Sequence, residues 1–150
     1  MLDPFSALGL AGNIVQFVDF SAKLVSGGVE LYRSADGALP KNAELKATVT
    51  DLSSITRKLQ THDQGSPQHP YSKDETALVN LSAQCKILGD KLVEVLEDLT
   101  VSGSHKKWKS VRQALRSVWK ETEIQDMQKR LDSFRSQITL RLIAILRFVI

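Results

Sequence analysis

The sequence has one cysteine, no apolar run of full membrane-spanning length near its N-terminus, and no secretory signal. The single Cys85 excludes an internal disulfide and fits a reducing compartment. The uncharged stretch from Phe5 to Val18 covers 14 residues, whereas a membrane-spanning helix needs about 20 apolar residues. Extended to Val25, the stretch would carry Asp19 and Lys23 into the membrane. No basic region and no small-residue cleavage site are present there, so we predict no cleaved leader.

Motifs for catalysis and metal binding are also missing. The sequence has no glycine-rich phosphate-binding loop and no Ser-His-Asp or Cys-His arrangement that would indicate a nucleophilic enzyme. Its histidines, His62, His69 and His105, are not spaced as zinc ligands with each other or with the cysteine. We therefore predict a protein that is not an enzyme and has no cofactor and no metal site.

The remaining pattern is helical throughout. Apolar residues recur every three or four positions, most regularly between 74 and 101, and no segment shows the alternation of a strand. We predict helices over residues 4–34, 41–61, 74–101, 104–123 and 123–150, with a loop over 62–73. These segments predict one all-α domain, residues 1–150, folded as a bundle of four to five helices with a long amphipathic N-terminal helix.

The first predicted helix carries a wide apolar stripe. Asp3 and Pro4 favour a helix start, and the Gly27–Gly28 pair predicts a kink. So apolar a helix must bury its stripe in a bundle, a partner or a membrane. It is either only a core helix, or a helix that is packed in one state and released to a membrane in another. The candidate insertion residues are Phe5, Leu8, Leu10, Ile14, Val15, Phe17 and Val18.

Positive charge is concentrated in the last third of the chain. Residues 1–103 have a formal charge of −4 and residues 104–150 have +7, which favours an anionic partner for the second part. The basic segment is either solvated helix surface or a contact with anionic lipid or protein, for which an interfacial tryptophan is suited. No nucleic-acid-binding module is recognisable, so we predict no nucleic-acid partner. The candidate residues are Lys106, Lys107, Trp108, Lys109, Arg112, Arg116 and Lys120.

The last predicted helix becomes apolar on nearly all sides after Ile138. An exposed patch of this kind is unfavourable on a monomer, so we predict contact with a following domain or a homo-oligomer. The chain stops inside this pattern, which we interpret as the front part of a longer protein. The candidate self-association residues are Leu140, Ile143, Leu146, Val149 and Ile150.

Two stretches resemble the N-terminal domain of many fungal NLR-like (STAND) proteins. The opening DPFSALGLAGNIVQFVDFSAKLVSGGVELYRSADG is similar to the start of that domain, and HKKWKSVRQALRSVWKETEIQDMQKRLDSFRSQITLRLIAIL is similar to its end. The segments DLSSITRKL and LVNLSAQCKILGDKLVEVLEDL are compatible with its central helices. The resemblance covers essentially the whole chain and indicates the HeLo-like group of helical bundles. In such proteins a NACHT or NB-ARC nucleotide-binding module and ankyrin, WD40 or TPR repeats follow.

The resemblance implies a cell-death effector in innate immunity or heterokaryon incompatibility. Such a domain is cytoplasmic, oligomerises on activation and moves to the plasma membrane, where the freed N-terminal helix inserts into or disrupts the bilayer. Asp19 and Lys23 depart from a purely apolar helix and would have to line a pore or stay at the interface. The alternative is a non-lytic helical module that self-associates or recruits a downstream protein partner.

Overall fold

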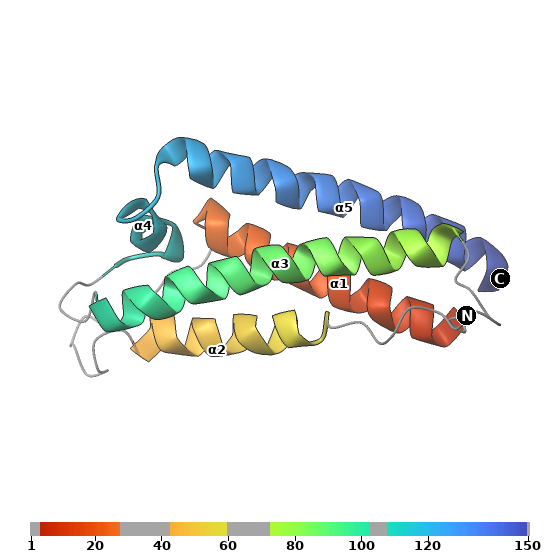
Figure 1. Ribbon diagram of the computed structural model, residues 1–150, viewed down its shortest axis with the longest axis horizontal. Coiled ribbons are helices and arrows are strands. Elements are labelled where there is room, and N and C mark those ends of the chain that lie inside the picture. Colours follow the sequence, from red (N-terminus) through yellow and green to blue (C-terminus); the bar gives the residue numbers. More distant parts are fainter. Residues whose placement is uncertain (1–3, 28–42, 60–72, 103–107, 150) are drawn as a thin grey trace.

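The computed structural model describes residues 4–27, 43–59, 73–102 and 108–149, and these ranges form five helices and no strand (Figure 1). The helices are α1 (Pro4–Ser26), α2 (Ala43–Arg57), α3 (Lys73–Ser102), α4 (Val111–Arg116) and α5 (Glu121–Val149). The prediction of an all-α bundle with a long N-terminal helix is therefore confirmed.

The bundle is arranged around α1, which contacts each of the other described helices and packs most extensively against α5. Figure 1 shows α1, α3 and α5 along the long axis, α2 beside α3, and α4 at the end of the bundle where α1 finishes. The first turns of α1 and the last turns of α5 lie together at the opposite end. Because α1 touches every other helix, its removal would expose core surface on all of them.

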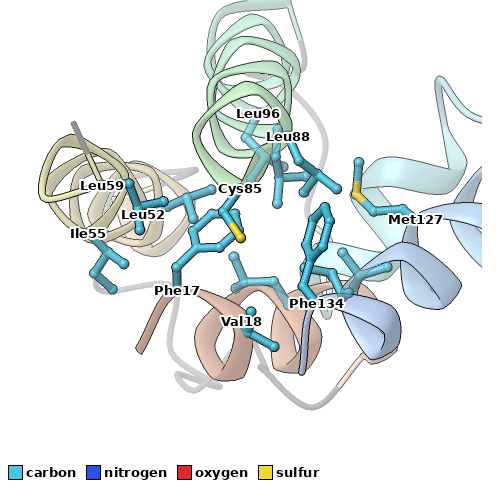
Figure 2. Packing of buried hydrophobic residues seen from close by; sticks show 14 of the residues in the cluster. Phe17, Val18, Leu52, Ile55, Leu59, Cys85, Leu88, Leu96, Met127 and Phe134 are labelled. Atoms are coloured by element: carbon cyan, nitrogen blue, oxygen red, sulfur yellow. The ribbon is translucent and has the colours of Figure 1, made fainter. Parts of the chain in front are cut away.

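The core is built from apolar side chains of all five described helices. In each helix the buried positions recur every three or four residues, which places them on one face. Figure 2 shows Phe17 of α1, Cys85 of α3 and Phe134 of α5 pointing into the same interior. The largest fully buried side chains are Phe17, Ile14, Leu24, Leu45, Leu52, Leu59, Leu78, Leu81, Leu88, Leu92, Leu96 and Leu115.

The first helix ends earlier than its sequence pattern predicts. We expected a helix to residue 34 with a kink at the glycine pair, but α1 ends at Ser26 and Gly27 follows with φ +88°. Only glycine adopts this left-handed conformation at no steric cost, and it commonly terminates helices. The kink prediction is therefore wrong at Gly27, and Gly28 lies outside the described residues.

The fourth predicted helix, residues 104–123, is wrong in extent. Trp108 to Ser110 are not helical, α4 covers only Val111–Arg116, and a turn separates it from α5. The start is fixed by Ser110, whose extended backbone and side chain cap the helix by accepting a hydrogen bond from the Gln113 amide at 3.1 Å. Serine followed three residues later by glutamine is a known capping signal, and the sequence contains it. The prediction missed it because the helical periodicity continues through Ser110.

The other helices begin and end within a few residues of the predicted positions. α2 is Ala43–Arg57 against a predicted 41–61, and α3 is Lys73–Ser102 against 74–101. α5 begins at Glu121, two positions before the predicted start. The predicted loop over 62–73 lies outside the described residues except for Lys73, which starts α3.

Candidate functional site

The candidate insertion residues lie on α1 and differ in burial along it. Ile14 and Phe17 are fully buried and Val18 is almost so, whereas Leu8, Leu10 and Val15 are half-buried. The side chain of Phe5 lies outside the described part of the chain. The apolar stripe of α1 is therefore already occupied by the bundle, and it can meet lipid only if α1 leaves its place.

The uncharged stretch alone was expected to be too short for a membrane, but Ser6–Ser26 of α1, with its two charged residues included, is long enough and apolar enough to cross one. Core helices of soluble bundles also have this length and apolar composition. Asp19 and Lys23 are the two charged residues within the stretch, and both are exposed at the bundle surface. Their spacing of four residues places them on one face of the helix, opposite the buried stripe.

The packing of α1 on α2 and α3 is close but leaves polar atoms unsatisfied. At Gly89 of α3 an added Cβ would stand 2.7 Å from Thr56 Cγ2 and 2.8 Å from Phe17 Cε2, so the three helices meet where a side chain has no room. The buried hydroxyls of Ser21 and Thr56 have no hydrogen-bond partner among the described residues. Such groups carry a desolvation cost. They therefore reduce the free energy that holds α1 in place.

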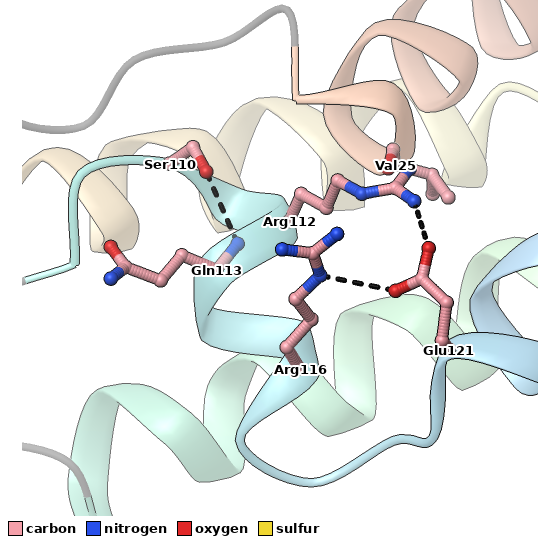
Figure 3. A network of polar contacts seen from close by, with 6 residues as sticks. All are labelled: Val25, Ser110, Arg112, Gln113, Arg116 and Glu121. Atoms are coloured by element: carbon pink, nitrogen blue, oxygen red, sulfur yellow. Dashed lines mark hydrogen bonds and ion pairs between the residues drawn. The ribbon is translucent and has the colours of Figure 1, made fainter.

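The described candidates of the basic segment fall into three groups: a buried tryptophan, two arginines that form ion pairs within the chain, and two exposed lysines. Trp108 is 8% exposed and belongs to the core. Arg112 and Arg116 both form ion pairs with Glu121, the first residue of α5 (Figure 3). Lys109 and Lys120 are exposed. The remaining candidates, Lys106 and Lys107, lie outside the described residues.

The electrostatics of this cluster keep Glu121 ionised. Desolvation works to raise the pKa of Glu121, but hydrogen bonds from Arg116 and Arg112 and their positive charges lower it below its ordinary value of 4.5. A lowered pKa in the folded state adds stability that is present above pH 4.5 and is lost as the pH falls through the lowered pKa. The ion pairs are therefore intact at neutral pH.

The apolar candidates of α5 form an exposed row near the C-terminal end of the helix. Leu140, Ile143 and Leu146 are 67%, 52% and 41% exposed, and the side chains of Val149 and Ile150 lie outside the described residues. Because the last turns of α5 lie beside the first turns of α1, two candidate sets meet at one end of the bundle (Figure 1). The basic cluster of α4 lies at the other end.

Cys85 is fully buried, and burial raises the pKa of its thiol from 9.0 to about 12. A thiol with this pKa is unreactive near neutral pH, because the thiolate is the nucleophile. Labelling of the Cys85 thiol by a reagent would therefore report opening of the bundle. No cluster of three or more metal-ligating side chains occurs in the described ranges. Comparisons with protein-family models, with curated proteins and with solved structures give no match.

Sequence reasoning missed the contacts that depend on distant residues. Lys91 of α3 lies over the ring of Trp119, 5.6 Å from its centroid, and Arg141 of α5 pairs with Asp74 of α3 at 2.8 Å. Neither pair has a local sequence signal, because its partners are distant in the sequence and are brought together only by the fold.

Proposed function

We propose that this chain is the N-terminal effector domain of a fungal NLR-like immune or incompatibility receptor. In this proposal it self-associates and targets or permeabilises the plasma membrane through α1, causing regulated cell death, with NACHT or NB-ARC and repeat domains on the same receptor chain. The observation that supports the proposal is that α1 combines two properties. It is long and apolar enough to cross a membrane, and it is packed against every other described helix.

The proposed mechanism exchanges one apolar environment for another. In the bundle the stripe of α1 is covered by protein, and in the membrane it would be covered by lipid, so the hydrophobic contribution is largely conserved. The exposed row on α5 lies beside the first turns of α1 and would place them at the bilayer surface.

Asp19 and Lys23 determine how α1 would lie in a membrane. Charged side chains in a bilayer pair with one another or face water. Four residues apart on one face, these two fit both requirements when several copies of α1 surround an aqueous path. The proposal therefore includes an oligomer rather than a single inserted helix.

The test uses Leu10→Asp, because Leu10 is half-buried whereas a charge at Ile14 or Phe17 would disrupt the core. Aspartate in a membrane-spanning helix costs about 2.5–3.5 kcal/mol, so dye leakage from anionic liposomes is expected to fall by about tenfold or more. The matched control is Gln16→Asp, which adds the same charge to the exposed face that already carries Asp19. We expect this control to retain most of the leakage.

The leakage result is interpreted together with the accessibility of the buried Cys85 thiol. Under the proposal, anionic liposomes accelerate labelling of Cys85 by a thiol reagent, since the release of α1 uncovers α3. Leakage that is equal for Leu10→Asp and the parent chain, or no leakage from either, would contradict the membrane role. Circular dichroism must show that both variants remain helical.

A second candidate function is a non-lytic module that self-associates or recruits a protein partner, and the exposed row on α5 favours it. Ile143→Lys places a charge in the middle of this row and is expected to weaken self-association by at least about tenfold. Ile87→Lys is the control, because Ile87 is 67% exposed on α3 and lies outside the row. Sedimentation equilibrium measures the dissociation constants.

The two functions then separate by their combined results. If Ile143→Lys abolishes both association and leakage, the row serves the membrane activity through the oligomer. If the parent chain associates through this row and no chain causes leakage, the adaptor function is favoured. Equal effects of Ile143→Lys and Ile87→Lys would show that the row is not the interface.

A further inference from the structure

The C-terminal end of α1 is held by an arginine from α4. Nη1 of Arg112 donates a hydrogen bond to the carbonyl oxygen of Val25 at 3.0 Å (Figure 3). The last four carbonyl groups of a helix have no partner within it and carry partial negative charge, so a cation is favourable there. The stem of the same arginine crosses Gly27, since an added Cβ would lie 3.5 Å from Arg112 Cδ.

The same guanidinium is also fixed to the start of α5. Nη2 of Arg112 donates to Oε1 of Glu121, and the other carboxylate oxygen accepts from Nε of Arg116 at 3.1 Å. The Arg112 side chain is 18% exposed, so water screens this contact less than it screens a surface pair. α4 is seated below it by Val111 and Leu115, both fully buried. One side chain thus joins the end of α1 to α4 and α5.

The first turns of α1, residues 6–13, are held by smaller contacts. Among residues 6–13 the buried side chains are the alanines Ala7 and Ala11, and the leucines are half-buried. Asn13 adds one hydrogen bond from its side chain to the carbonyl oxygen of Lys58 at 3.2 Å. Gly9 and Gly12 lower helix stability, and an added Cβ at either position would meet no atom within 4 Å. Residues 14–25 bury a phenylalanine, an isoleucine, a leucine and two valines. The free energy that holds α1 therefore increases from its N-terminal end to its C-terminal end.

We infer that α1 detaches from its N-terminal end while the contact of Arg112 with Val25 and Glu121 anchors its C-terminal end. Local opening begins where buried area is small and proceeds to the strongest contact. The inference deepens the proposed function, because it states how the insertion helix would be released, but the opening itself takes place without a membrane. The ion pair of Asp19 with Arg135 does not serve as an anchor, since both side chains are about half exposed.

Amide hydrogen exchange of the chain in solution tests the inference. In the parent chain the amides of residues 9–13 are expected to exchange at least about tenfold faster than those of residues 20–25. Arg112→Met keeps an apolar stem over Gly27 and removes both polar contacts. It is expected to accelerate residues 20–25 by about tenfold and to leave residues 9–13 within about twofold. The control Arg135→Met makes the same substitution at the exposed pair and is expected to change neither segment.

Two results would overturn the inference. Equal exchange along α1 in the parent chain would show that the helix leaves as one unit. Equal acceleration by Arg112→Met of residues 20–25 and of residues 88–92 in the middle of α3 would show that Arg112 stabilises the whole bundle rather than one end of α1. The experiment contains no lipid, so a failure of the liposome test leaves it unaffected, and its own failure leaves the membrane proposal standing.

Discussion

Phe17→Ala is expected to lower the free energy of unfolding by about 3–5 kcal/mol. Phe17 is fully buried and lies where α1, α2 and α3 meet, so its removal leaves a cavity lined by all three helices. Small domains have about 5–15 kcal/mol in total, and the variant therefore loses a large share of its stability. Urea unfolding followed by circular dichroism measures the change.

Phe20→Ala is the matched control for this prediction. It removes the same side chain from the same helix, but Phe20 is only half-buried and packs at the edge of the core. The expected loss is below about 2 kcal/mol, because a partly exposed ring buries less apolar area. If both variants lost the same stability, Phe17 would not be the centre of the α1 packing. In Phe17→Ala we also expect faster labelling of Cys85, since the cavity opens beside the thiol.

Gly89→Ala is expected to destabilise the chain, although alanine is the better helix former by about 1 kcal/mol. The new Cβ would stand 2.7 Å from two atoms of Thr56 and 2.8 Å from Phe17, distances at which the side chains must move. Overpacking of a core costs about 1–3 kcal/mol, so the net change is a loss that grows with residue size. Gly89→Val should therefore be worse than Gly89→Ala in thermal unfolding.

At two other helical glycines, substitution by alanine is expected to stabilise the chain. Gly9→Ala and Gly12→Ala place the same methyl group where no atom lies within 4 Å, and each is expected to gain about 0.5–1 kcal/mol. A double variant tests the cause at Gly89. Thr56→Ala removes both close atoms and a hydroxyl that has no partner in the described chain. It should therefore recover part of the loss of Gly89→Ala, and strictly additive effects would contradict the steric explanation.

The helical class and the main helix positions were predictable because they depend on local periodicity. The repeat of buried residues in α3 is visible in the sequence and is reproduced in the core from Leu78 to Leu99. The end of α1 was not predictable in the same way. A glycine pair permits either a kink or a stop, and the stop is supported by Arg112, which contacts Val25 across a separation of 87 residues. The residues near the glycine pair do not indicate such a contact.

The candidate site was predictable as a list of side chains but not as an arrangement. Sequence periodicity identifies the stripe of α1, yet it does not tell that Ile14 is fully buried while Leu10 is half-buried, because burial within the stripe depends on the packing of the other helices. Trp108 was a candidate for solvated surface or for a contact with lipid or protein, and the structure instead places it in the core before α4 begins. Arg112 and Arg116 were candidates for solvated surface or for a lipid or partner contact, and in the bundle both form ion pairs with Glu121.

The exposed apolar row of α5 and the arginines of α4 lie at opposite ends of an elongated bundle. α3 has 30 residues, and at 1.5 Å per residue it extends over about 45 Å. A flat bilayer cannot touch both ends of an upright rod of this length. Under the proposed membrane role the bundle would have two distinct orientations at an anionic surface. One is led by the exposed Lys109 and Lys120, and the other by the apolar row of α5, beside which Arg141 and Arg147 lie. Conversion between them would require the whole molecule to turn over before the leading turns of α1 meet lipid.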